Sequence, residues 1–189
     1  NEGNARLTTT LPRVHVALVG LEKLVPDLSA ALRIIKVLPK NATGQALTSY
    51  VTWITGAVAC AASATGKKIL HIVFLDNGRL ELARDPIFSE ALRCIRCGAC
   101  SNVCPVYGKV GGHTLGHVYI VAIGLILTYF YHGKDNARAI VRNCLNCQAC
   151  KSVCPVNIDL PYLIKKVYAN ILKDEGAKPA KNTILSAVM

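Results

Sequence analysis

The chain has 189 residues, 52% of them hydrophobic and 17% charged, so it can bury a core, and global disorder is excluded. It carries 22 lysines and arginines against 11 acidic residues, a net charge of +11. Nucleic-acid binding is a poor explanation of that charge, because the basic residues are scattered and only 6% of residues are aromatic.

The first part of the chain, residues 1–90, has the pattern of an incomplete α/β domain. The valine-rich run 14–19, which ends before a glycine, predicts a buried strand. Residues 47–54 predict a second strand, and residues 69–75 a third that ends in an Asp-Asn-Gly turn. Strands separated by a helix in this order indicate parallel α/β packing.

Two segments have the apolar spacing of amphipathic helices. Residues 21–38 place apolar side chains mostly three or four positions apart, with Pro26 near the start and Pro39 expected to end the helix. Residues 158–172 show the same spacing, and the polar residues 173–189 are expected to form a loose tail.

Two apolar stretches, residues 51–65 and 118–131, are shorter than the roughly 20 residues that span a bilayer. Each is expected to be a buried strand or helix, with interfacial contact left open for the second. The first residue is Asn and no secretory signal follows it, so we expect the chain to be a fragment of a longer protein.

An internal repeat contains eight of the nine cysteines. Residues 94–106 match residues 144–156 at an offset of 50 positions, and each copy reads C-x2-C-x2-C-x3-C-P. Three closely spaced thiolates can bind one face of a cubane cluster, and in two-cluster ferredoxins the fourth cysteine ligates the other cluster. Zinc usually takes separated C-x2-C pairs, and a disulfide framework needs an oxidising compartment, so both are poorer interpretations.

The repeat therefore predicts two [4Fe–4S] clusters with exchanged fourth ligands. The first would be bound by Cys94, Cys97, Cys100 and Cys154, and the second by Cys144, Cys147, Cys150 and Cys104. Because each copy contributes to both clusters, cluster loss is expected to unfold this part of the chain. The ninth cysteine, Cys60, lies in an apolar, alanine-rich run and is predicted to be a core thiol.

The residues beside the cysteines suit such a site. Pro105 and Pro155 turn the chain away from it, and small residues such as Gly98, Ala99 and Ala149 let backbone N–H groups approach the sulfurs. Four basic residues flank the cysteines and either tune the clusters and dock an acidic partner or are simply solvated: Arg93, Arg96, Arg142 and Lys151.

Other chemistry is weakly indicated. His113 and His117 either lie beside a cluster or satisfy loop hydrogen bonds, and His15 and His71 are expected to be structural residues within strands. No G-x-G-x-x-G follows a strand, so NAD dependence is not predicted, and no Ser/His/Asp set stands out. Four residues either line a substrate pocket or are ordinary strand and helix-start residues: Thr8, Thr9, Thr10 and Glu22.

The sequence also resembles a known family. Segments similar to the lactate-utilisation (LUD) domain are residues 3–15, 20–26 and 42–45, and the likeness continues through residues 93–100 and 111–113. Most of residues 3–170 resembles the iron–sulfur subunits of bacterial L-lactate-oxidising complexes, in which a LUD domain precedes a two-cluster ferredoxin module. One departure is the stretch 118–131, which is more apolar than the family pattern and could mark a different docking surface.

The resemblance implies three parts. Residues 1–84 would be the C-terminal part of a LUD-like α/β domain with a NagB/CoA-transferase-like fold, residues 85–172 a mostly helical two-cluster ferredoxin-type domain, and residues 173–189 a tail. It also implies a cytoplasmic location, at the inner face of the membrane if membrane-associated. The expected partners are a cysteine-rich iron–sulfur protein and a second LUD protein, or a flavoprotein acceptor.

The function expected on these grounds is electron transfer through two clusters in an L-lactate-oxidising complex, as a subunit of an oxidoreductase. The alternative is the same role for another 2-hydroxy acid or in a heterodisulfide-type enzyme, which the cysteines fit equally well. An enzyme with its own substrate site in the α/β half, or a cluster-bearing structural or sensor protein, is a further hypothesis.

Overall fold

The computed structural model describes residues 2–57 and 66–175. The chain divides into two compact units, Asn1–Leu80 (unit 1) and Glu81–Met189 (unit 2), and each is described by itself. The predicted core thiol Cys60 and most of the predicted tail lie outside the described residues.

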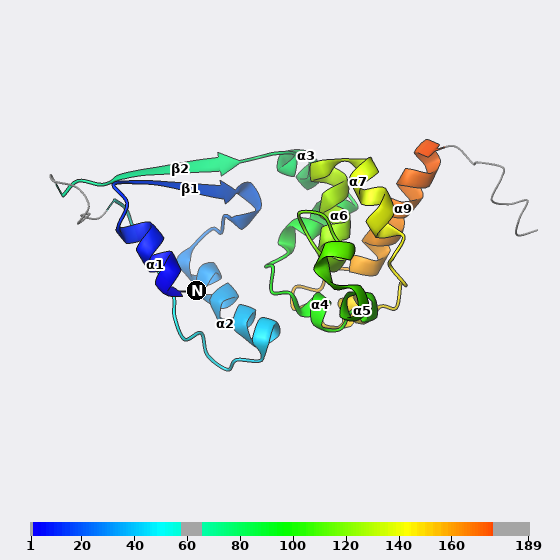
Figure 1. Ribbon diagram of the computed structural model, residues 1–189, viewed down its shortest axis with the longest axis horizontal. Coiled ribbons are helices and arrows are strands. Elements are labelled where there is room, and N and C mark those ends of the chain that lie inside the picture. The colour runs from blue at the N-terminus through cyan, green and yellow to red at the C-terminus, as the bar shows by residue number, and fades with distance from the viewer. Residues whose placement is uncertain (1, 58–65, 176–189) are drawn as a thin grey trace, which may run out of the picture. The chain divides into compact units, whose positions relative to one another are not determined.

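Unit 1 is built on a parallel pair of strands (Figure 1). Its elements are α1 (Glu2–Thr10), β1 (Val14–Gly20), a 3-10 turn η1 (Leu21–Lys23), α2 (Leu28–Thr43) and β2 (Ile69–Leu75). The register runs from Val14 opposite Ile69 to Gly20 opposite Leu75. The two strands predicted at these positions and their parallel packing are confirmed, and His15 and His71 lie within them as expected.

The predicted strand at 47–54 is wrong, since these residues have no regular secondary structure. Its β-branched and aromatic residues favour a strand only where a neighbouring strand offers a ladder of hydrogen bonds. Here β1 and β2 pair directly with each other. The strand at 14–19 is not buried as predicted, since Leu18 is 72% exposed, and Ile72 in the neighbouring strand is 56% exposed.

Helix α2 differs from its prediction at both ends. It begins at Leu28, where the Asp27 carboxylate accepts a hydrogen bond from the Ala30 N–H at 2.7 Å, so Asp27 is the N-cap. It continues through Pro39 and ends at Thr43, and the C-cap Gly44 adopts a left-handed φ of 72°. The prediction that Pro39 ends the helix is therefore wrong.

A side chain compensates for the proline inside α2. Pro39 has no N–H to donate to the carbonyl of Ile35, four residues earlier in the helix. That carbonyl instead accepts a hydrogen bond from the Thr48 hydroxyl at 2.7 Å. The irregular segment after α2 thus supplies the donor that the proline lacks, which allows the helix to continue.

Unit 2 is helical. Its elements are α3 (Arg79–Arg84), which contains the division between the units, a 3-10 helix η2 (Phe88–Arg93), α4 (Ala99–Asn102), α5 (Pro105–Thr114), α6 (Val121–His132), α7 (Lys134–Val141), α8 (Ala149–Ser152) and α9 (Leu160–Glu175). The mixed α/β and helical fold class is confirmed. Helix α9 confirms the helix predicted at 158–172, but it starts two residues later and continues to Glu175, into the segment predicted as a loose tail.

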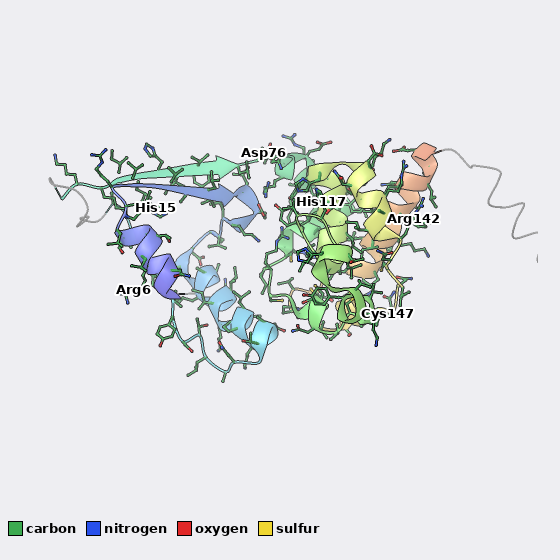
Figure 2. The ribbon with its side chains drawn as sticks, in the orientation of Figure 1. Arg6, His15, Asp76, His117, Arg142 and Cys147 are labelled. Carbon is green, nitrogen blue, oxygen red and sulfur yellow. The ribbon has the colours of Figure 1, made fainter. Side chains whose placement is uncertain are left out.

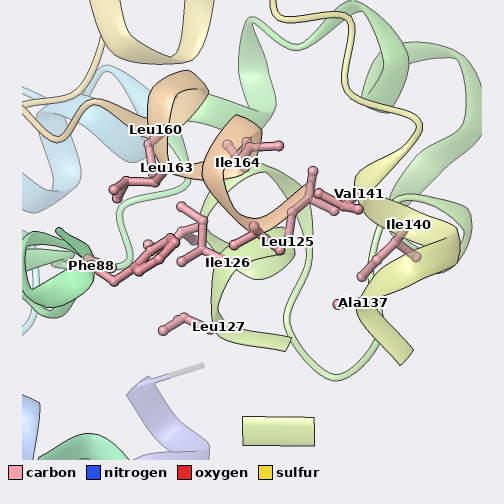
Figure 3. Packing of buried hydrophobic residues seen from close by; sticks show 14 of the residues in the cluster. Phe88, Leu125, Ile126, Leu127, Ala137, Ile140, Val141, Leu160, Leu163 and Ile164 are labelled. Atoms are coloured by element: carbon pink, nitrogen blue, oxygen red, sulfur yellow. The ribbon is translucent and has the colours of Figure 1, made fainter. Parts of the chain in front are cut away.

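The core of unit 2 forms around α6, which contacts α7 and α9 (Figure 3). Residues 121–128 are all buried, so the apolar run 118–131 is largely a buried helix, as predicted. Phe88 of η2 packs edge-to-face against Phe130, with ring centroids 4.9 Å apart. Among the helices of the described residues, none has the length and apolar character needed to cross a membrane.

Candidate metal centre

The two cysteine repeats fold in the same way. In the first, Arg96 and Gly98 have left-handed φ values of 61° and 78°, and α4 follows directly. In the second, Asn146 and Gln148 occupy the same positions with φ values of 54° and 66°, before α8. The equivalence at an offset of 50 residues in sequence therefore extends to the backbone.

The fourth cysteine of each repeat is held by backbone N–H groups. The Cys104 sulfur accepts a hydrogen bond from the Tyr107 N–H at 3.5 Å, at the start of α5. The Cys154 sulfur accepts one from the Ile158 N–H at 3.4 Å. N–H groups that face a sulfur stabilise a thiolate, and they also tune the potential of a bound cluster.

Four of the predicted ligands line one cavity of about 300 Å³. They are Cys94, Cys97 and Cys100 of the first repeat together with Cys154 of the second. Apolar side chains that include Ile123 complete much of the wall. A thiol-lined, largely apolar cavity suits a [4Fe–4S] cluster, for which cysteine thiolates are the usual ligands.

The other four cysteines interact electrostatically. Burial raises the pKa of Cys144, and the nearby Cys104 and Cys147 raise it further, against a backbone hydrogen bond at Asn146. Burial also raises the pKa of Cys150 to about 12, with contributions from Cys100, Cys144 and Cys147. The structure thus places Cys104 of the first repeat close to Cys144 of the second.

The two sets lie near each other. Burial raises the pKa of Cys100 to about 11, with Cys94 and Cys97 adding to it, and Cys100 in turn influences Cys150. Within the described residues, no three or more histidine, cysteine or acidic side chains are grouped as for a metal ion. The first four sulfurs instead line the cavity described above.

Tyr119 belongs to this site, although no sequence motif singles it out. It lines the first cavity, and the Arg96 guanidinium lies over its ring, 4.8 Å from the centroid. Its ring also lies 5.8 Å from that of His132, which in turn packs edge-to-face with His117 at 5.1 Å. A tyrosine two residues beyond the Gly116-His117 pair belongs to no motif, so only the fold reveals it.

The four residues considered for a substrate pocket are not brought together. The hydroxyls of Thr8, Thr9 and Thr10 donate to backbone carbonyls one turn earlier in α1, at 2.8, 3.2 and 2.5 Å. Thr9 and Thr10 line a small cavity with His15 and Lys68, and Glu22 is not part of it. Their hydroxyls thus bond to the helix backbone.

Glu22 instead forms an ion pair with Arg79. Their side chains are 6% and 5% exposed. Burial alone would raise the pKa of Glu22, but the hydrogen bond and charge of Arg79 outweigh it and hold the pKa below its ordinary value. The pair ties η1 to the segment after β2 and is a structural feature of unit 1.

Both halves of the chain match known families. Residues 1–75 match the LUD domain, and residues 90–158 match the 4Fe-4S dicluster domain. The first match is thus to a LUD domain and the second, later in the chain, to a 4Fe–4S dicluster domain. No solved structure gives a significant match.

Three relatives show which individual proteins the chain is similar to. The chain is 40% identical over 179 residues to Lactate utilization protein B of Bacillus subtilis (strain 168), covering 95% of this chain and 37% of the relative. It is 38% identical over 185 residues to the protein of that name from Lysinibacillus sphaericus (strain C3-41), covering 98% and 38%. It is 43% identical over 136 residues to Uncharacterized electron transport protein YkgF of Escherichia coli (strain K12), covering 71% and 28%.

The chain thus spans less than two fifths of the length of these relatives. Together with the dicluster domain, they support an iron–sulfur electron-transfer role.

Proposed function

We propose that the chain is the electron-transfer part of an L-lactate-oxidising complex and holds two [4Fe–4S] clusters. The observation that carries this proposal is the cavity lined by three cysteines of the first repeat and the fourth cysteine of the second. A site shared between two repeats is the arrangement expected of a two-cluster ferredoxin. Clusters of this type carry single electrons.

The ligand sets in the proposal are those predicted from the repeat. Cys94, Cys97, Cys100 and Cys154 would hold the first cluster, and Cys144, Cys147, Cys150 and Cys104 the second. The electrostatic coupling of Cys104 with Cys144 supports the second set. The electrostatic coupling between Cys100 and Cys150 supports two clusters that lie close together, so that an electron can pass rapidly from one to the other.

The substrate assignment depends on the LUD domain and on the names of the relatives. In the proposed complex, the partners of this subunit are a cysteine-rich iron–sulfur protein and a second LUD protein; the alternative partner is a flavoprotein electron acceptor. The two-cluster domain is proposed to span residues 85–172, after the part of the LUD domain contained in residues 1–84.

Electron paramagnetic resonance tests the proposal on the native complex, purified without oxygen. L-lactate is added to one sample and dithionite to a second as the control. We expect reduced-cluster signals in both samples. Signals with dithionite alone would exclude L-lactate as the direct donor while leaving the clusters in place.

The same experiment tests the alternative class of substrate. Other 2-hydroxy acids replace L-lactate in further samples, at equal concentration and time. If one of these acids reduces the clusters and L-lactate does not, that acid is the electron donor. Absence of any cluster signal with dithionite would overturn the electron-transfer proposal itself.

A further inference from the structure

The two cysteine loops share one backbone fold, but they differ in exposure. In the first repeat, Ile95 and Cys97 are half-buried. At the same places in the second repeat, Leu145 is 68% exposed and Cys147 is exposed. Two sites with the same local fold therefore face different surroundings.

The difference arises from the segment that precedes α6. Residues 118–121 line the first cavity together with its cysteines, and Arg96 is held against Tyr119 within this wall. The second repeat has Asn146 at the place of Arg96, and Asn146 is exposed. The first loop is therefore covered by protein, whereas the second meets solvent.

Basic side chains lie beside the exposed loop. Arg142 and Lys165 line a shallow cavity of about 250 Å³ together with Cys144 and Asn146, and both basic side chains are exposed. Arg142 and Cys147 are both seen on unit 2 in Figure 2. Lys151 on α8 is 45% exposed and pairs with Asp159. An apolar Leu145 beside basic residues has the composition of a transient docking surface with an apolar centre and a charged rim.

We propose that electrons pass between this protein and its redox partner at the loop of the second repeat, residues 144–148, and that the partner is an acidic one-electron carrier of the flavodoxin type. This inference rests on the proposed function and adds the point of electron exchange to it. Electron transfer falls steeply with distance, so the less covered cluster exchanges fastest, and the basic rim selects an acidic partner.

The step balances as a single-electron transfer. One electron leaves the reduced centre held by the second cysteine set, which returns to its oxidised state. The oxidised flavin of the carrier takes up this electron and one proton from solvent and becomes the neutral semiquinone. No bond of the protein is made or broken.

Stopped-flow kinetics with the full-length protein tests the docking face. The protein is reduced with dithionite, desalted and mixed with an oxidised acidic flavodoxin, and semiquinone absorbance is followed at low and high salt. We expect Lys165→Glu to lower the second-order rate constant about tenfold at low salt, Lys165→Gln to lower it less, and the differences to shrink at high salt. The matched control is Arg84→Glu, an exposed charge reversal on α3 away from the cysteine loops in Figure 1.

Two further experiments test the docking face without a charge reversal. Leu145→Ser removes the apolar centre without changing charge, so we expect slower transfer at every salt concentration, with Leu172→Ser on α9 as its control. Carbodiimide cross-linking of the two proteins is expected to join Lys165 to a carboxylate of the carrier. Iron content and the reduced-cluster signals should stay unchanged in all these variants.

The docking face is wrong if Lys165→Glu and Arg84→Glu slow the transfer equally, or if the cross-links map outside the second repeat and α9. A full-length protein that lacks iron–sulfur absorbance would instead overturn the proposed function. The two failures are therefore distinguishable.

Discussion

At the scale of single residues, the ion pair between Glu22 and Arg79 joins positions 57 residues apart in unit 1. From the sequence, Glu22 is either a pocket residue or an ordinary helix-start residue, because nothing in the local pattern points to a partner so far along the chain. Removing one member of a buried pair leaves an uncompensated charge, which is more damaging than losing the attraction itself.

We expect Arg79→Met to lower the stability of unit 1 by about 3 kcal/mol, because the Glu22 carboxylate is left buried without its partner. The measurement is urea unfolding followed by the fluorescence of Trp53, the single tryptophan of the chain, which lies in unit 1. Exposed Arg33→Met on α2 is the control. Because the folded pKa of Glu22 is lowered, the pair's contribution is present above the ordinary carboxyl pKa and is lost as pH falls through the folded value. A variant whose acid sensitivity matches the wild type would contradict this account.

The exchanged ligand sets give a second prediction at this scale. Cys104→Ser is expected to remove the same cluster signal as Cys147→Ser and to lower iron content to about half. Cys97→Ser should remove the other signal, and Cys60→Ser neither. If Cys104→Ser instead removes the signal lost in Cys97→Ser, then each repeat holds its own cluster and the exchange is wrong.

At the scale of secondary-structure elements, α2 shows why a sequence pattern misplaces a helix end. Proline ends a helix because it leaves a carbonyl without a donor and crowds the preceding turn. The Thr48 hydroxyl supplies the donor from 13 residues beyond Ile35, outside any local window. The same contact occupies the segment predicted as a strand.

A double-mutant cycle measures this contact. Thr48→Val is expected to destabilise unit 1 by about 1 kcal/mol, because the Ile35 carbonyl loses its donor. In a Pro39→Ala background the new N–H bonds to that carbonyl, so the same substitution should have almost no effect. Thr43→Val on the same helix is the control and should have equal effects in both backgrounds. Equal effects of Thr48→Val in the two backgrounds would contradict the compensation.

Helix α6 packs closely against the wall of the first cavity. A Cβ atom on Gly124 would lie 2.5 Å from the backbone of Tyr119, which lines that cavity. We expect Gly124→Ala to destabilise unit 2 by about 1–3 kcal/mol and to alter the signal of the cluster bound by the first set. Gly108→Ala on α5, where an added Cβ meets nothing within 4 Å, is the matched control. Thermal unfolding and electron paramagnetic resonance check both effects, and identical behaviour of the two variants would refute the contact.

At the scale of the whole molecule, the sequence predicted what depends on local spacing. The strands at 14–19 and 69–75 and the buried run before His132 follow from continuous apolar runs, and the last helix follows from apolar spacing. The cavity shared by Cys94 and Cys154 follows the repeat. The exposure of the strands and of the cysteine loops could not be predicted from the sequence. Whether a strand or a cysteine loop is covered depends on segments distant in sequence, such as the one containing Tyr119.

The two-unit organisation gives the last prediction. Removing the clusters with an oxidant and a chelator is expected to lower the thermal midpoint of unit 2 by about 10 °C or more, because cluster binding contributes to its folding. The transition reported by Trp53 in unit 1 should stay in place. Far-ultraviolet circular dichroism and tryptophan fluorescence record the two transitions on one sample. A common shift of both would show that the units unfold together.

The parallel pair of β1 and β2 also affects how the polypeptide behaves in a crowded solution. Each strand of the described sheet has one hydrogen-bonded neighbour, and side chains such as Leu18 and Phe74 are exposed. Open strand edges with apolar side chains are templates for intermolecular pairing, which natural proteins usually block with charge or cover. During synthesis, the solubility of unit 1 therefore depends on how quickly these edges are occupied. Aggregation competes with folding during the slowest step in the assembly of unit 1, while these edges are still open.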